Sequence, residues 1–152
     1  MDSLEGMPKV YTTLLDRLDN YSERWDRRFD PERFTLREVL AHMVDYDSIW
    51  NEYIDLALAK SDGPAEAPLY TPDLVASRRD YSATDPKQSL HDLRTRRTAL
   101  VAKLCPLDTG AWVAHAITSP RHGLLNIDEL VSLFVGHDGY HARQIAEFVT
   151  AE

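Results

Sequence analysis

The chain has 152 residues, 43% of them hydrophobic and 28% charged, a composition typical of one globular domain that excludes a disordered or fibrous protein. A formal net charge of −8 argues against a nucleic-acid partner, because phosphate binding depends on clustered Lys and Arg. A single cysteine, Cys105, and the lack of a basic leader or an apolar run of about 18 residues predict a cytoplasmic protein without a membrane partner.

The first predicted element is an amphipathic helix of about six turns. Apolar residues recur at helical spacing from Met7 to Trp25, and the charged residues of this segment fall on other faces. We expect the helix to end near Asp30-Pro31, because proline disfavours helical geometry in the residue before it.

A second helix is expected to begin at Thr35-Leu36-Arg37-Glu38. This tetrapeptide fits a capping box, in which the Thr hydroxyl and the Glu carboxylate each accept a hydrogen bond from an otherwise unpaired amide. Apolar residues then form two adjoining stripes, Leu36, Leu40, Met43, Trp50 and Ile54 on one and Val39, His42, Tyr46, Ile49, Tyr53 and Leu56 on the other. Such a broad apolar surface predicts contact with more than one neighbouring helix.

A long connection follows, from Ser61 to Thr84. Its helical periodicity is weak and three prolines interrupt it, which predicts a crossover loop. A short helix is expected after Thr71-Pro72, because Thr is a favoured cap and proline is tolerated at the first helical position.

The second half of the chain predicts two more helices. Asp85-Pro86 starts the third helix by the same logic, and Pro106 ends it. Residues 107–125 are expected to form an ordered loop over one end of the molecule, and the fourth helix runs from Asn126 to Thr150. The sequence therefore predicts a single all-α domain over residues 1–152, a four-helix bundle with a long crossover connection between its second and third helices.

Three histidines lie on stripes that should face the core. Steps of three and four residues along the fourth helix lead to His137 and His141, which lie one turn apart and can aim at one interior point. His42 lies on an apolar stripe of the second helix. Neutral imidazoles are common ligands of divalent metals, so the three predict a metal site whose affinity falls as pH drops through about 6.5. Each histidine taken alone also fits a hydrogen-bonded core residue.

Four further residues are candidates for the surroundings of this site. Gln144 shares the face of the paired histidines, as a polar core residue also would. Asp138 is rotated about 100° from His137, which favours bracing a neighbouring helix over binding metal. Asp45 lies about one turn from His42, where it would orient an imidazole, add a carboxylate ligand or simply be solvated. Tyr46 would line a pocket and donate a hydrogen bond, or would belong to the core.

The remaining histidines separate from this set. His91 stands beside Asp92 in a charged stretch and is expected to be exposed. His115 and His122 fall in the expected loop, where a surface or bracing role is the simpler interpretation, although either is able to approach the site from above.

Two segments and a turn resemble the DinB-like, or YfiT-like, metalloprotein superfamily. They are Leu40-Ala41-His42-Met43-Val44-Asp45, the Gly123 turn before Asn126, and Gly136-His137-Asp138-Gly139-Tyr140-His141-Ala142-Arg143-Gln144-Ile145. The resemblance covers essentially the whole chain and implies a four-helix bundle with a long crossover. It also implies that His42, His137 and His141 hold nickel, zinc, iron or manganese.

Three protein ligands would leave coordination positions open, as in catalytic metal sites. The resemblance implies a thiol S-transferase or a thiol-dependent isomerase, with a low-molecular-weight thiol and a small-molecule substrate as partners. Wide apolar helix surfaces add an expectation of a homodimer. The alternative is a non-catalytic metal- or small-ligand-binding stress-response protein. A di-iron carboxylate site is disfavoured, because it needs two Glu-x-x-His motifs and the chain offers only Asp138-Gly139-Tyr140-His141.

Overall fold

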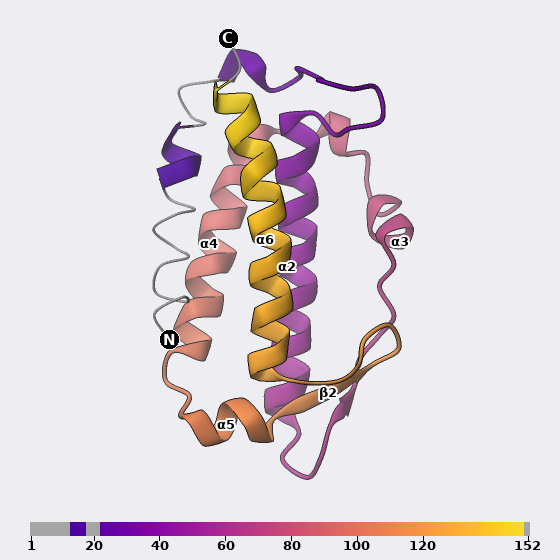
Figure 1. The fold of residues 1–152 in the computed structure, drawn as a ribbon, viewed down its shortest axis with the longest axis vertical. Coiled ribbons are helices and arrows are strands. Elements are labelled where there is room, and N and C mark those ends of the chain that lie inside the picture. The colour runs from indigo at the N-terminus through magenta and orange to yellow at the C-terminus, as the bar shows by residue number, and fades with distance from the viewer. Residues whose placement is uncertain (1–12, 18–21, 151–152) are drawn as a thin grey trace.

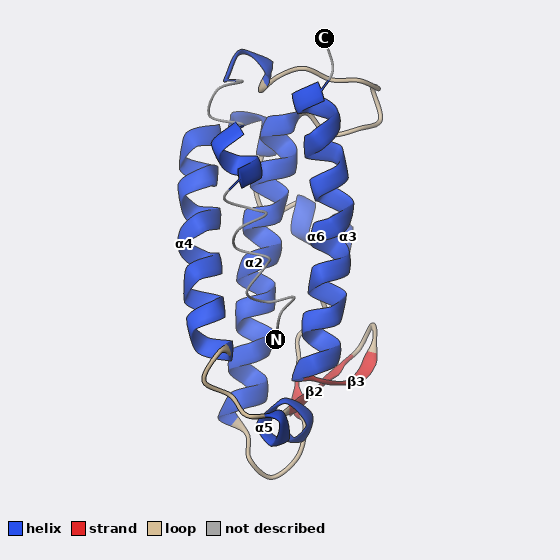
Figure 2. Cartoon of the chain, turned by 60° about the vertical axis from the view of Figure 1, so that its left-hand side comes forward, coloured by secondary structure: helices blue, strands red, loops and turns tan. Residues whose placement is uncertain are grey.

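Three long helices dominate the computed structural model, which describes residues 13–17 and 22–150 (Figure 1). They are α2 (Leu36–Ala59), α4 (Pro86–Leu104) and α6 (Ile127–Thr150). Figure 2 shows α2 between the other two, and it contacts both, which confirms that its broad apolar surface serves more than one neighbour. None of the helices in the described residues is long and apolar enough to cross a membrane.

The first predicted helix falls largely outside the described residues. Residues 13–17 are helical, but Ser22–Arg24 form the short 3-10 helix η1 and the chain is irregular from there to α2. The prediction that this helix continues towards Asp30 is therefore wrong. The reason is tertiary: Trp25 is buried, and its carbonyl accepts a hydrogen bond of 3.0 Å from the amide of Arg37 in the first turn of α2.

The predicted helix starts are confirmed at four positions. Thr35 and Glu38 form the reciprocal capping box of α2, with the amide of Thr35 2.7 Å from Glu38 Oε2. Thr71 caps the short helix α3 (Pro72–Ala76), and Asp85 caps α4. At the start of α6, the Asn126 side-chain oxygen accepts a hydrogen bond of 2.9 Å from the amide of Glu129. Each side chain accepts a hydrogen bond from an amide that has no partner within its own helix.

The connections between the long helices contain short elements. The strand β1 (Ala65–Glu66), α3 and the 3-10 helix η2 (Tyr81–Ala83) lie between α2 and α4. The ordered loop expected over residues 107–125 contains regular structure, namely α5 (Thr109–Ala114), β2 (Ala116–Ser119) and the start of β3 (Gly123–Asn126).

The three strands form a small sheet that an all-α prediction does not include. β2 pairs with β1 in parallel and with β3 in antiparallel fashion, beside the α5 end of α6 (Figure 2). Gly123 has a φ of 74°, which permits the tight turn between β2 and β3. Strands of four residues are too short for their alternating pattern to stand out in a sequence.

Two apolar clusters fill the space between the helices. The cluster nearer α5 includes Ile49, Leu100 and Phe134, and the cluster nearer the start of α2 includes Val44, Leu93 and Ile145. Each of the three helices contributes to both clusters. Buried polar side chains occur along the helices between these two sets of residues, so a polar layer separates the two apolar clusters.

A buried ionic bridge forms part of this polar layer and joins all three helices. The Arg97 guanidinium of α4 lies 2.7 Å from Asp47 of α2 and hydrogen-bonds both carboxylate oxygens of Asp138 of α6. It also stacks over the Phe134 ring at 4.0 Å. All three charged side chains are less than 7% exposed, and together they carry a formal charge of −1.

Burial and ion pairing shift the pKa values of these groups in opposite directions. Burial raises the pKa of Asp47 to about 6, although the adjacent Arg97 charge lowers it. Burial alone would lower the pKa of Arg97, but the hydrogen bonds and charges of the two carboxylates raise it overall. Arg97 therefore stays charged, and it pairs with two carboxylates that would otherwise be very costly to bury.

We predict that Arg97→Ala lowers the free energy of unfolding by about 3–5 kcal/mol, because it leaves two buried carboxylates without a counter-ion. Urea unfolding followed by circular dichroism measures this loss. Arg94→Ala is the matched control, since Arg94 lies in the same helix and pairs with Asp16 at 2.7 Å on the surface. The control should cost less than about 1 kcal/mol. Equal losses in the two variants would contradict the structural role of the bridge.

Candidate metal centre

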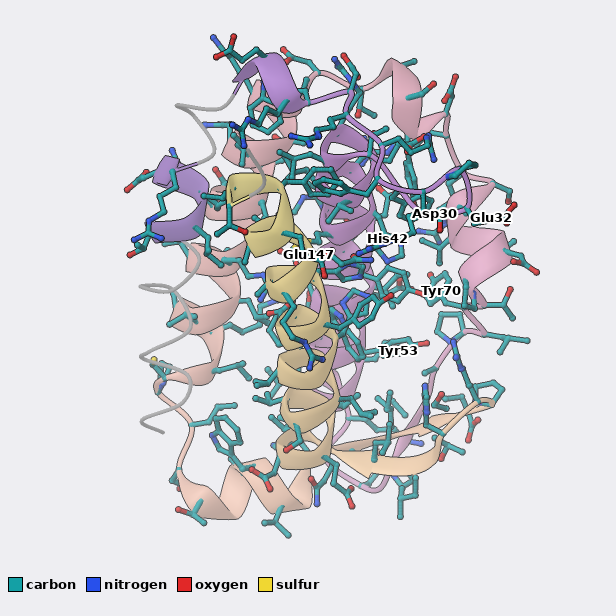
Figure 3. All side chains as sticks on the ribbon, turned by 45° about the horizontal axis from the view of Figure 1, so that its top comes forward. Asp30, Glu32, His42, Tyr53, Tyr70 and Glu147 are labelled. Carbon is teal, nitrogen blue, oxygen red and sulfur yellow. The ribbon has the colours of Figure 1, made fainter. Side chains whose placement is uncertain are left out.

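The side chains of His42, His137 and His141 converge between α2 and α6. The Nε2 atom of His137 lies 3.4 Å from that of His42 and 3.2 Å from that of His141. One ligand atom from each of the three residues lies within 4.8 Å of the others. Figure 3 shows His42 beside α6, with Glu32 and Tyr70 farther out on the α3 side. The structure thus brings together the three histidines that the sequence singled out.

The rotation of α6 decides which way its histidines face. Asp138 points into the polar layer towards Arg97, so His137, about 100° away around the helix, faces α2. His141 follows one turn later on the same side. The Tyr46 ring stacks on the His137 ring with centroids 4.4 Å apart and lies 4.6 Å from the His42 ring, which holds both imidazoles in place.

Gln144 orients the third imidazole. Its side-chain oxygen lies 2.7 Å from His141 Nδ1, and an amide oxygen only accepts hydrogen bonds. His141 therefore carries its hydrogen on Nδ1 and leaves a lone pair on Nε2, the atom that faces His137. A hydrogen bond that fixes the far nitrogen in this way is typical of metal-ligating histidines.

Hydrogen bonds among the imidazoles alone leave the cluster poorly satisfied. His137 Nε2 lies near two other Nε2 atoms, but it carries at most one hydrogen, which can point squarely at only one of them. His42 Nδ1 is buried without a hydrogen-bond partner in the described structure. A cation between the three Nε2 atoms would use all three lone pairs at once.

The environment keeps the imidazoles neutral. Burial, followed by the charge of the neighbouring histidines, lowers the pKa of His42 and of His137 to about 3. Burial also lowers the pKa of His141, although Gln144 and Asp138 partly oppose it. These lowered pKa values predict that the affinity for metal falls at a lower pH than the ordinary histidine pKa of about 6.5. Neutral imidazole is the form that binds metal.

Two of the three nitrogen separations fit one tetrahedral ion. Two ligand nitrogens held at about 2.0–2.1 Å from a tetrahedral ion are about 3.3 Å apart. The two Nε2 separations of 3.2 and 3.4 Å lie on either side of this value. The donor set, the tautomer and the neutral state of the rings thus all suit a divalent metal.

A cavity of about 510 Å³ opens onto the three histidines. Its wall combines aromatic, cationic and acidic side chains, with Glu32, Arg33, Phe34, His42, Tyr46, Trp50, Pro72, Arg121, His122, Leu133, His137, Tyr140, His141 and Gln144 lining it. A small organic molecule fits this volume. An ion on the histidines would therefore face a space large enough for a substrate.

Of the other four candidate residues, two contact the histidines and two pair with arginines. Gln144 and Tyr46 touch the histidines as described. The Asp45 carboxylate pairs with Arg79 at 2.9 Å, and no contact between Asp45 and an imidazole is seen among the described residues. Asp138 reaches Arg97, so it braces a neighbouring helix.

The remaining histidines lie apart from the three Nε2 atoms. His91 is exposed on α4. His115 Nδ1 lies 3.1 Å from the carbonyl of Ala57 in the last turn of α2, where it satisfies a terminal carbonyl. His122 lines the cavity, as does Arg121 beside it. No sequence signal marks Arg121, because its place in the wall depends on the fold of the β2–β3 hairpin.

Comparisons with known proteins agree with this fold. The sequence model of the DinB superfamily matches residues 3–145. Among solved structures, YfiT from Bacillus subtilis aligns with a TM-score of 0.75 at 18% identity, covering 95% of this chain and 85% of its own. YfiT is described as a probable metal-dependent hydrolase with an unusual four-helix bundle topology. The four-helix-bundle prediction is thereby confirmed. No curated protein sequence matches the chain.

The lowered histidine pKa values predict that the metal-free protein loses stability on acidification. Below the unfolded value of about 6.5 the unfolded chain takes up protons that folded His42 and His137 refuse down to about 3, so unfolding becomes more favourable across this window. Urea unfolding of chelator-treated protein at a series of pH values measures the loss. The double variant His42→Gln, His137→Gln should show a shallower dependence, and an unchanged slope would contradict the assignment.

Replacing the orienting amide should weaken metal binding while the three ligands stay in place. We expect Gln144→Met to raise the Kd for zinc about 10–100-fold, because His141 loses the acceptor that fixes its tautomer. Competition with a chromophoric chelator gives the Kd. Gln144→Glu keeps an acceptor at the same position and should bind zinc at least as well as Gln144→Met. Wild-type affinity in Gln144→Met would rule out the orienting role.

Proposed function

The chain belongs to the DinB superfamily, and on that premise we propose that it is a metal-dependent enzyme whose ion is held by His42, His137 and His141. The observation that carries the proposal is the convergence of three neutral imidazole nitrogens on the wall of a substrate-sized cavity. Three ligands leave coordination positions open, whereas a purely structural site is closed by four protein ligands. Nickel, zinc, iron and manganese all accept imidazole ligands.

We propose transfer of a low-molecular-weight thiol as the reaction. A divalent ion at this site would lower the pKa of a thiol or of water that binds to it. Attack by the sulfur on an electrophilic carbon of the second substrate would form a carbon–sulfur bond, release the leaving group with its bonding electrons and pass the thiol proton to solvent. A thiol-dependent isomerisation would begin with the same attack.

The residues around the histidines supply binding and orientation. Tyr46 and Gln144 hold the imidazoles, and the Phe34, Trp50 and Tyr140 side chains offer apolar surface to the carbon skeleton of a substrate. When both reactants are bound on one wall, their reaction becomes effectively unimolecular, which lowers its entropic barrier. The low-dielectric surroundings of the cluster strengthen its electrostatic effects.

The metal assignment predicts distinct behaviour for different histidine variants. His137→Ala should lose most of the bound metal, because the remaining pair forms an incomplete site. His91→Ala, which changes an exposed residue, should keep it, and so should His122→Ala, which changes the cavity wall outside the cluster. Elemental analysis of purified proteins gives the metal content. Equal contents in His137→Ala and His91→Ala would overturn the three-histidine site.

Activity is tested separately with metal-loaded and chelator-treated protein. We expect thiol-dependent conversion of monochlorobimane to its fluorescent thioether, with cysteine or glutathione as the thiol, only in the loaded form. Loss of the signal on chelation and its return with added metal would support thiol transfer. Metal-dependent cleavage of an ester that needs no thiol would favour hydrolysis instead. A loaded protein without either activity would favour the non-catalytic, ligand-binding role.

A further inference from the structure

Arg121 brings a positive charge into the wall of the three-histidine cavity. It lies between β2 and β3, where its backbone amide is 3.3 Å from Ser119 Oγ. Burial raises the pKa of the Tyr46 hydroxyl, and the nearby Arg121 charge partly opposes this. Within the described residues no carboxylate forms an ion pair with it. Most of its five N–H donors remain open to a ligand.

The polar groups near Arg121 are mainly donors. Tyr46 lines the same cavity, and burial raises the pKa of its hydroxyl, which therefore keeps its hydrogen to donate. Donors on this wall, the Arg121 guanidinium and the Tyr46 hydroxyl, favour a ligand that brings acceptor oxygens.

The described side chains of the cavity wall offer a ligand about one unpaired positive charge, that of Arg121. Arg33, the other arginine of the wall, pairs with Glu147 at 2.7 Å. Burial and the Arg121 charge lower the pKa of His122, which keeps that ring neutral. Glu32, which also lines the cavity, adds a negative charge that disfavours a polyanion. A monoanion therefore matches the wall better than a phosphate dianion does.

We propose that the cavity binds a small monocarboxylate, with the carboxylate on Arg121 and the Tyr46 hydroxyl and its planar or apolar body against the aromatic walls. A guanidinium offers two parallel donors that match the two oxygens of a carboxylate. Tyr46 stacks on His137, so a group held by its hydroxyl lies beside the histidine cluster. This inference rests on the proposed function and gives its second substrate a chemical class.

Calorimetric titration of the metal-loaded protein with benzoate, and with benzamide as its neutral counterpart, tests the proposal. We expect Arg121→Gln to weaken benzoate binding about tenfold or more and to leave benzamide unchanged, because only benzoate uses the charged pair. Tyr46→Phe keeps the ring and should weaken benzoate by a smaller factor. Arg143→Gln removes the same charge from an exposed position on α6 outside the cavity and should have no effect.

The controls separate this proposal from the metal assignment. A carboxylate could also bind an ion on the histidines, but that binding would disappear on chelation and would not respond to Arg121→Gln. Benzoate affinity equal in wild type and Arg121→Gln, or no benzoate binding at millimolar concentration, would overturn the carboxylate site. If inorganic phosphate bound more tightly than benzoate, the proposed preference for a monoanion would be overturned. Metal content unchanged in Arg121→Gln would show that the histidine cluster is intact in either case.

Discussion

The ionic bridge from Arg97 to Asp47 and Asp138 determines how the three long helices meet. Its charges are buried, so any rotation or sliding of α6 that separated Asp138 from Arg97 would leave a bare carboxylate in the interior. That constraint holds the neighbouring residue, His137, towards α2. The same bridge divides the apolar core in two and gives the polar layer a place in the middle of the molecule.

The histidine cluster depends on this layer for its electrostatics as well as its geometry. The bridge carries a formal charge of −1 beside three neutral imidazoles whose lone pairs point at one another. Burial resists protonation of the rings, and hydrogen bonds among them leave ring nitrogens poorly paired. A bound cation would use the Nε2 lone pairs and would offset the excess negative charge of the bridge, which is why the site suits a metal better than a proton.

Rigid helices and irregular segments contribute differently to the cavity. α2 and α6 carry the histidines together with Tyr46 and Gln144, whose positions are set by packing over many turns. Arg33 and Phe34 come from the segment before α2, and Arg121 from the β2–β3 hairpin. Ligand recognition on connections around a rigid centre allows specificity to change while the centre is preserved.

Local patterns in the sequence were enough to predict the caps at Thr35 and Asp85, the three long helices and the shared face of His137 and His141. These features depend on residues within one or two turns of each other, as caps and helical spacing do. The partner of Asp138, the turn of Asp45 towards Arg79 and the entry of Arg121 into the cavity were decided only in the tertiary structure. Each depends on a side chain far away in the chain, whose position exists only once the helices and the hairpin have packed.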